Sequence, residues 1–294
     1  MRQRLSFFLL FVSSLAFAGN NRSAVSLGGS DMNPCTPAAP CRSFSAAAAV
    51  TNAGGEIIAL DSAGYGPFTI SQAVTVSGAP GVHAAITSTT AAAIHVAAPS
   101  AFVRLRNLVL IGNGGTSGVE VGAVGVLDVS DLSISGFSDS GIFSFGGVLI
   151  ADRCHITDIG TSAILFLNAS GSISNSEIVA NNIGIYVQQN SSVAITHCVV
   201  AKNSVGISSA SSQNGQVTDT LVADSVIVGN SNGVGAGGSN GTSLLRLSSD
   251  VIFNNGTGVQ GGAGATIDSY GNNDINGNAI DLAPGTSLTS VAQR

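Results

Sequence analysis

Residues 173–207, ISNSEIVANNIGIYVQQNSSVAITHCVVAKNSVGI, contain the same unit twice. In each copy an alternating apolar run leads to an asparagine, and a Gly-Ile pair follows. Asn181 precedes Ile185 by four residues and Asn203 precedes Ile207 by four, so the copies lie 22 residues apart (207 − 185). Self-similarity at a fixed period of 20–50 residues indicates a solenoid.

The same register extends in both directions along the chain. It gives ten aliphatic anchors at intervals close to 22 residues: Ile70, Ile94, Val119, Ile142, Ile164, Ile185, Ile207, Val234, Val259 and Ile280. The runs around these anchors are short, alternate with period two and favour Val, Ile, Ser and Thr, which is typical of strands and not of helices. We therefore predict an all-β fold, a parallel β-helix (β-solenoid) of about ten coils.

Five asparagines stand four residues before an anchor: Asn181, Asn203, Asn230, Asn255 and Asn276. With one repeat per coil, these side chains fall above one another at the strand spacing of roughly 4.8 Å. Stacked amides can hydrogen-bond along the axis, as they do in cross-β assemblies. The spacing predicts an asparagine ladder.

The sequence divides into four segments. Residues 1–18 have a basic start, an apolar core and an Ala-Phe-Ala ending, which predicts a signal peptide cleaved near Ala18. Residues 19–54 are expected to form an amino-terminal cap, residues 55–282 the β-helix, and residues 283–294 a tail. No later stretch reaches 18 apolar residues, so we expect no transmembrane segment and a secreted or periplasmic protein.

A helix is expected within residues 42–53, RSFSAAAAVTNA. Ser43 can cap its start, alanines favour its interior, and the Gly54-Gly55 pair ends it. Such a helix would cover the open first coil, which would otherwise present an unpaired edge.

The four cysteines fall into two pairs. Cys35 and Cys41 flank a five-residue loop in a segment expected to be exported, which favours a disulfide, with free thiols or a metal pair as alternatives. Cys154 and Cys198 occupy one register position, and Ser176 occupies it on the coil between them. Two strand spacings, about 9.6 Å, exceed the reach of a disulfide. We expect two buried thiols.

The charge composition argues against a nucleic-acid partner. The chain has 10 basic and 16 acidic residues. Removal of Arg2 and Arg4 leaves 8 basic against 16 acidic residues, and Lys202 is the single lysine. Phosphate binding needs a basic face, so a nucleic-acid partner is not expected. Nothing in the sequence predicts a cofactor or a metal site, and the oligomeric state is left open.

The segment GGSDMNPCTPAAPCRSFSAAAAVTNAGGEIIALDSAGYGPFTI (residues 28–70) and the NxxG[IV] coils after it resemble secreted bacterial right-handed parallel β-helix repeat proteins of the pectin-lyase-like superfamily. The resemblance covers about residues 26–282 and implies the fold and its right hand. Members include polysaccharide lyases, glycoside hydrolases, epimerases, tailspikes and adhesins, so the fold alone assigns no activity. The N-T-D, D-D, G-H-G and R-I-K elements of galacturonan hydrolases are absent from this sequence. No Asp-rich cluster with a partnered arginine is obvious.

Two sets of residues are candidates for function. In each coil the residue after the anchor should point outward, which gives the column Glu120, Phe143, Leu165, Tyr186, Ser208, Gly235, Gln260 and Asp281. A second outward column contains Phe145 and Leu167. Aromatic faces suit sugar rings, and exposed apolar patches often mark interaction sites. The stripe of Phe143, Phe145, Leu165 and Tyr186 is therefore the predicted substrate-binding set.

The second set lies around the sequence ADRCHITD, residues 151–158. By register, Asp131, Arg153, Asn175 and His197 form one column, and His155 lies over Glu177. A histidine beside a carboxylate can act as general acid or base, so Asp131, Arg153, His155 and Glu177 are the catalytic candidates. The alternative interpretation is a solvated charge ladder that keeps coils in register. Arg104 over Asp128, and Arg106 toward Asp152, are expected surface pairs.

Three functions follow from these observations. The first is binding of a polysaccharide or cell-surface glycan along the outer face. The second is a lyase, hydrolase or epimerase acting on an acidic polysaccharide. The third is a structural or adhesive surface element. The missing catalytic motifs place binding ahead of catalysis.

Overall fold

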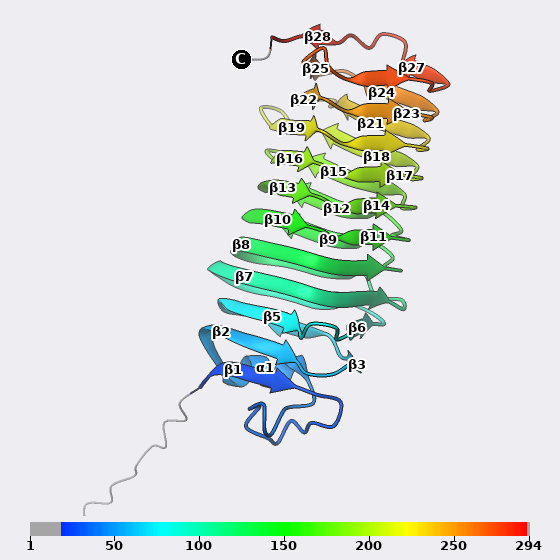
Figure 1. Cartoon of the computed structure of the whole chain (residues 1–294). Coiled ribbons are helices and arrows are strands. Elements are labelled where there is room, and N and C mark those ends of the chain that lie inside the picture. Colours follow the sequence, from blue (N-terminus) through cyan, green and yellow to red (C-terminus); the bar gives the residue numbers. More distant parts are fainter. Residues whose placement is uncertain (1–18, 293–294) are drawn as a thin grey trace, which may run out of the picture.

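The computed structural model describes residues 19–292, so the predicted signal peptide lies outside the described residues. The chain forms an all-β right-handed parallel β-helix of about ten turns with one short helix near the amino terminus (Figure 1). Each coil contributes three strands in succession, and each strand pairs with its equivalents in the coils before and after it. The predicted fold class is confirmed.

The strands form three faces, which we number I to III. Face I consists of β1 (Asn20–Val25), β2 (Thr51–Ala59), β5 (Val74–Gly78), β10 (Val148–Asp152), β13 (Ser170–Ser174), β16 (Ser192–Thr196), β19 (Val217–Ala223), β22 (Thr242–Ser248), β25 (Ala265–Ser269) and β28 (Thr289–Ser290). Face II consists of β3 (Ala63–Tyr65), β6 (Ala84–Ser88), β11 (His155–Thr157), β14 (Glu177–Val179), β17 (Val199–Ala201), β20 (Val226–Val228), β23 (Val251–Phe253) and β26 (Asp274–Asn276).

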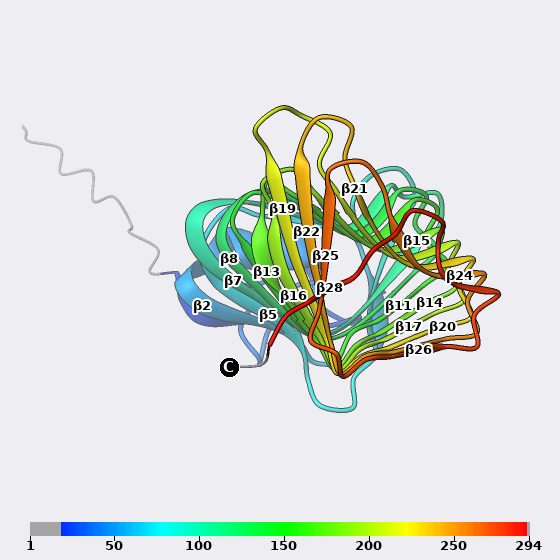
Figure 2. The same ribbon diagram turned by 90° about the horizontal axis from the view of Figure 1, so that it is seen from above.

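Face III consists of β4 (Phe68–Ile70), β9 (Ser140–Phe145), β12 (Ser162–Leu167), β15 (Ile183–Gln188), β18 (Val205–Ala210), β21 (Asn232–Gly237), β24 (Thr257–Gly261) and β27 (Ile280–Leu282). The long strands β7 (Ile94–Gly112) and β8 (Ser117–Ser135) pass through all three faces. Between faces III and I, two longer loops project from the coil (Figure 2). They are residues 211–216 and 238–241, where the sequence also lengthens.

The inside of the coil is filled by columns of aliphatic side chains. Eight anchors, from Ile94 to Val259, pair in the predicted register and are fully buried. The two end anchors were wrong by two residues, because Ile94 pairs with Phe68 instead of Ile70, and Val259 pairs with Leu282 instead of Ile280. Each buried aliphatic side chain contributes about 1.5–3 kcal/mol, so the columns supply most of the driving force for folding.

The asparagine ladder runs through the turn between faces II and III. Asn181, Asn203, Asn230 and Asn255 are buried, and the side-chain oxygen of each accepts from the backbone N–H of the preceding member of the column. The fifth member is Asn278 and not Asn276, because the last coil is shifted by the same two residues. The Asp281 carboxylate accepts from both nitrogens of Asn278 and ends the ladder.

The first coil is closed as predicted. Helix α1 (Phe44–Val50) begins after Ser43, whose hydroxyl accepts from the Ala46 N–H, a cap worth about 1 kcal/mol. It ends at Val50, earlier than the glycine pair predicted. Phe44 packs on Tyr65 and Phe68 inside the coil. A disulfide joins Cys35 to Cys41 and encloses the loop before the helix.

The other end is closed by residues 283–292, which cross over the last coil (Figure 2). The Thr286 hydroxyl accepts from the Gly261 N–H, Leu288 packs against the core, and β28 pairs with β25. The tail therefore covers the open end of the hydrophobic interior.

Candidate functional site

Face III carries the predicted apolar stripe on its outer surface. Phe143 pairs with Leu165, and Leu165 pairs with Tyr186, so the three side chains lie on successive coils. Phe145 and Leu167 form a second column two residues further along the same strands. Phe145 is 47% exposed, and the other four are half-buried. The predicted outward placement is confirmed, whereas the substrate-binding role stays a prediction.

The alternation of these strands explains why the stripe points outward. Ile142, Ser144, Ile164, Phe166 and Val187, which stand between the stripe residues, are fully buried. Successive side chains of a strand point to opposite faces, so burial of this set turns the stripe toward solvent.

The stripe is the middle of a longer column. In register order the outer column of face III is Thr69, His95, Glu120, Phe143, Leu165, Tyr186, Ser208, Gly235 and Gln260. From His95 to Gln260 it makes seven steps of about 4.8 Å, or roughly 34 Å. Asp281, predicted as the last member, is displaced by the register shift of the final coil and caps the asparagine ladder instead.

A hollow lies at each end of this column. The hollow near the cap has a volume of about 460 Å³ and is lined by Ser45, Pro67, Phe68, Thr69, Ala91, Ala92, His95 and Glu120. The hollow near the tail has a volume of about 360 Å³ and contains Ser208, Gly235 and Gln260 of the column together with residues of the two projecting loops. Face III thus presents an apolar stripe between two depressions.

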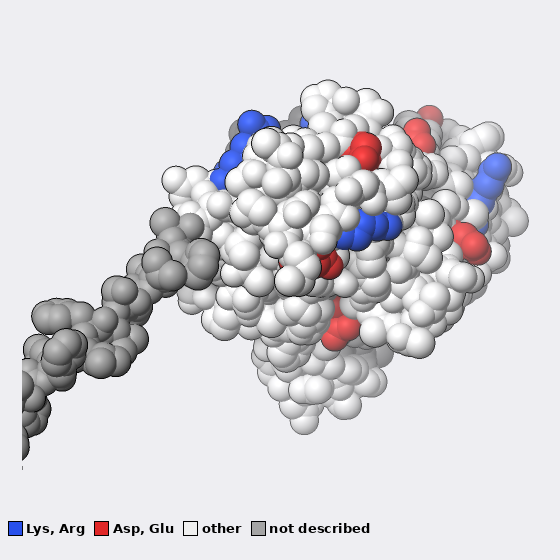
Figure 3. All heavy atoms as spheres, turned by 90° about the horizontal axis from the view of Figure 1, so that it is seen from below, with Lys and Arg blue, Asp and Glu red and all other residues white. Residues whose placement is uncertain are grey.

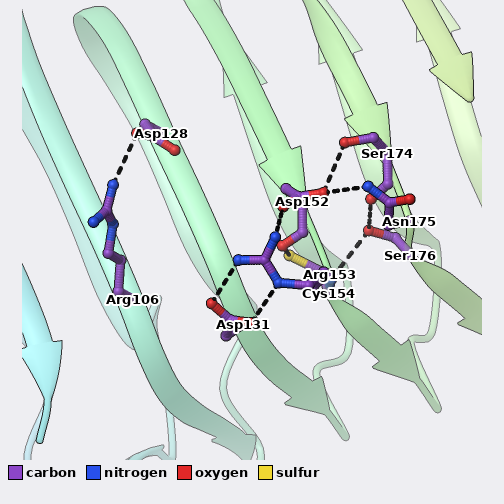
Figure 4. A network of polar contacts seen from close by, with 9 residues as sticks. All are labelled: Arg106, Asp128, Asp131, Asp152, Arg153, Cys154, Ser174, Asn175 and Ser176. Atoms are coloured by element: carbon purple, nitrogen blue, oxygen red, sulfur yellow. Dashed lines mark hydrogen bonds and ion pairs between the residues drawn. The ribbon is translucent and has the colours of Figure 1, made fainter. Parts of the chain in front are cut away.

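The four catalytic candidates lie elsewhere, at the turn between faces I and II and on face II. The Arg153 guanidinium bonds the two Asp131 carboxylate oxygens at 2.8 and 3.0 Å and also contacts the Asp152 carboxylate (Figure 4). The bond from Arg153 lowers the pKa of Asp131 below its usual value. The four residues of the predicted column, Asp131, Arg153, Asn175 and His197, all have a left-handed backbone conformation, with φ between 49° and 56°.

His155 pairs with Glu177 as predicted, with 3.2 Å between Nδ1 and the carboxylate oxygen. All four candidate side chains are 46–63% exposed, and none of them lines a hollow described above. The Arg153–Asp131 and His155–Glu177 pairs are separate, and neither is near the stripe. This geometry is that of the alternative interpretation, a solvated charge ladder, and the catalytic role stays a prediction.

Asp152 lies at the centre of the network around Arg153, although the sequence analysis did not include it among the candidate site residues. Its carboxylate accepts from the Ser174 hydroxyl at 2.9 Å and the Asn175 amide at 2.8 Å, and the Asn175 bond contributes most to a lowered pKa (Figure 4). The predicted Arg106–Asp152 pair was wrong, because Arg106 lies 3.7 Å from Asp128. Arg104 does pair with Asp128, at 3.1 Å.

A column of small polar residues lies inside the same turn. The Cys154 N–H donates to the Ser176 hydroxyl, and the Cys198 N–H donates to the Ser225 hydroxyl. Both thiols are free and buried, as predicted, and burial raises their pKa values to about 12 for Cys154 and about 11 for Cys198. They are therefore protonated and unreactive at neutral pH.

The same column contains a buried carboxyl group that the sequence analysis missed. Asp250 is 1% exposed and accepts from the backbone N–H groups of Ser225 and Ser248. Burial raises its pKa to about 7. Asp250 stands two residues before the buried Ile252, as Cys198 and Ser225 stand two residues before Val200 and Ile227, which pair in the same column. Extension of the column of Cys154, Ser176 and Cys198 would therefore have found it.

Most arginines of the described chain are paired with carboxylates. Five of the six arginines in residues 19–292 contact a carboxylate, and the exception, Arg42, donates to the Gly64 carbonyl. Figure 3 shows the cap end, where scattered blue and red groups lie on a largely uncharged surface. The strands of face III carry no Lys or Arg. Residues 19–292 contain no group of three or more His, Cys, Asp or Glu arranged to hold a metal ion.

Comparison with known proteins identifies the class. Residues 92–280 match the family described as right handed beta helix region, and the chain belongs to this family. A search of curated protein sequences gives no match.

Solved structures give the same fold. Pectate lyase Pel9A is similar at 17% identity and a TM-score of 0.55, over 95% of this chain and 78% of that one. The alginate lyase from Paenibacillus sp. str. FPU-7 has 11% identity and a TM-score of 0.59, over 92% and 99% of the two chains. The enzymatically active domain of bacteriophage CBA120 tailspike protein 2 has 10% identity and a TM-score of 0.59, over 90% of this chain and 47% of the tailspike. At these identities the likeness shows the fold alone.

Two observations bear on location. A disulfide in this β-helix is consistent with a compartment outside the cytoplasm, where such bonds persist. Within residues 19–292, no helix has the length and apolar character needed to cross a membrane.

Proposed function

We propose that this protein is exported and binds a polysaccharide along the outer face of face III. The observation that carries the proposal is the stripe of Phe143, Leu165 and Tyr186, which lie in register on three successive coils and point outward. Aromatic side chains offer large apolar surfaces with polar edges, which suit the faces and hydroxyl groups of sugar rings. A repeating polymer and a repeating surface can make the same contact on successive coils.

Several further observations support an extended ligand. The outer column continues past both ends of the stripe to a total length of roughly 34 Å and contains polar side chains at Glu120, Ser208 and Gln260. The similar pectate and alginate lyases are named for polysaccharide substrates, which accords with this ligand class.

The proposal is binding and not cleavage. Arg153 is engaged by two carboxylates, and the His155–Glu177 pair is solvent-exposed, so these groups lack the enclosed environment that tunes catalytic residues. They are also on a different side of the coil from the stripe. We expect no new product when polysaccharides are incubated with the protein.

The test is affinity electrophoresis of the purified chain in gels that contain soluble polysaccharides, followed by titration calorimetry on those that retard it. The double variant Phe143→Ala/Tyr186→Ala should weaken binding by about 10-fold or more. Phe102→Ala is the matched control, because Phe102 is 40% exposed on face I and contacts Arg104. Retardation that persists unchanged in the double variant would remove the stripe as the binding surface.

A further inference from the structure

The hollow at the cap end of the outer column contains two polar groups without partners. His95 and Glu120 are register neighbours on β7 and β8, and both side chains line the hollow. Both are half-buried. Among residues 19–292, neither side chain has a hydrogen-bonding partner, whereas Arg153 and His155 are each paired with a carboxylate. Their polar atoms are therefore available to a ligand in the hollow.

The rest of the hollow completes a site of defined character. The exposed residues Thr69 and Ser45 add hydroxyl groups to its lining, and Phe68, which is 4% exposed, also lines it. No Lys or Arg lines it. A carboxylate, an imidazole and hydroxyl groups can accept from and donate to the hydroxyl groups of a sugar. A uronate would find no lysine or arginine there to pair with its carboxylate.

The hollow is also continuous with the stripe. Glu120 pairs with Phe143, the first aromatic residue of the stripe, so a sugar ring on Phe143 would have its neighbour one coil away, over Glu120 and His95. Gly122 leaves room beside His95, because a Cβ at position 122 would lie 3.3 Å from the His95 ring.

We infer that this hollow is a subsite for a neutral sugar residue, held through its hydroxyl groups by Glu120 and His95, at the cap end of the chain that lies on the stripe. The inference rests on the proposed polysaccharide binding and narrows it to neutral glycans. A carboxylate can accept two hydroxyl groups of one ring, and hydrogen bonds to charged groups are worth more than neutral ones. A single carboxylate falls short of the pair that glycoside hydrolysis commonly uses, so the subsite binds without cleaving.

The experiment is titration calorimetry of the purified chain with xylan, mannan and a β-1,3-glucan as neutral polymers, and with polygalacturonate and alginate as acidic ones. We expect at least one neutral polymer to bind about 10-fold or more tightly than either acidic polymer. Glu120→Gln and His95→Ala should each weaken that binding by about 10-fold. Glu56→Gln is the control, since Glu56 lies on face I and pairs with Arg22. Circular dichroism melting checks that each variant is folded.

The outcomes separate the two proposals. Binding that requires Phe143 and Tyr186 but is unchanged in both Glu120→Gln and His95→Ala overturns this subsite and leaves the stripe. Tighter binding of the acidic polymers overturns the assignment to neutral sugars. Absence of binding to all five polymers overturns the polysaccharide proposal itself.

Discussion

The asparagine ladder gives the sharpest test of how the coils are held in register. In the substitution Asn203→Ala, the buried amide at the second position of the ladder is removed. Its oxygen accepts from the Asn181 backbone N–H at 2.8 Å and from the Asn181 amide at 3.1 Å. Its nitrogen donates to the Ile178 carbonyl at 3.1 Å and to the Asn230 oxygen at 3.0 Å.

The four lost bonds do not have equal consequences. The Asn181 backbone N–H has no other partner and becomes a buried unsatisfied donor, which costs about 1–3 kcal/mol. The Asn181 amide still donates to two carbonyls, and the Asn230 oxygen still accepts from the Asn203 backbone. The three other bonds therefore cost only their net value, about 0.5–1.5 kcal/mol each. We expect a loss of about 2.5–7.5 kcal/mol in the free energy of unfolding, the sum of these terms.

The assay is equilibrium urea unfolding followed by circular dichroism, with hydrogen exchange to locate the weakened coils. Asn276→Ala is the matched control, because Asn276 is exposed, contacts Asp274 and lies outside the ladder. Its effect should stay within about 0.5 kcal/mol. Equal effects of the two substitutions would refute both the ladder and the corrected register of the last coil.

Three further substitutions test other parts of the fold. Asp250→Asn removes a buried carboxyl group whose pKa is about 7 in the folded chain and 3.8 in the unfolded chain. Because the folded state holds this proton more tightly, the wild type loses stability as the pH rises from about 4 to about 7. The free energy of unfolding of the variant should equal that of the wild type at pH 4. At pH 8 it should be higher by about 1–3 kcal/mol, a figure that allows for the lost hydrogen bond from Ser248. A difference in melting temperature that does not change with pH would contradict this. Ile185→Asp places a charge in the fully buried interior and should abolish the cooperative unfolding transition, so a wild-type melting curve would count against the register. Cys35→Ser with Cys41→Ser opens the loop before α1 and should cost about 2 kcal/mol, a loss that reduction of the wild type should reproduce.

The sequence predicts the middle of this molecule better than its ends, for a physical reason. Between Ile94 and Val259 each coil lies between two others, so a slip of two residues would unpair the ladder and the anchors together. At Ile70 and Ile280 only one neighbouring coil constrains the register, and the strand pairs with a shift of two. Asn276 and Asn278 are both asparagines, so residue type alone does not show which of them belongs to the ladder. The hydrogen bond from Asn255 to Asn278 and the bond from Asn278 to Asp281 identify Asn278 as the member.

The candidate sites show where register alone is insufficient. The repeat register predicted that Phe143, Leu165 and Tyr186 point outward and that His155 lies over Glu177. Strand alternation fixes the direction of a side chain, and the coil spacing fixes its neighbour. It did not reveal that Asp152 competes for Arg153, since that contact is between sequence neighbours at a turn, where side-chain direction follows from the left-handed backbone. Nor did it reveal the hollow beside His95, which is also lined by Ser45 in the cap and by Pro67 directly before β4.

The distribution of charge connects the fold to the proposed ligand. A β-helix repeats one coil, so a charged position in one coil faces a similar position in the next, and like charges would repel at about 4.8 Å. The described chain resolves this on faces I and II by alternating sign, as in Arg104 over Asp128 and Arg153 over Asp131. Face III avoids the problem by having almost no charge, and its one carboxylate on the outer column of β8, Glu120, lies between a histidine and a phenylalanine. A surface of this kind attracts no polyanion, and the groups that it does present, aromatic rings and hydrogen-bonding side chains, are those that recognise uncharged sugars.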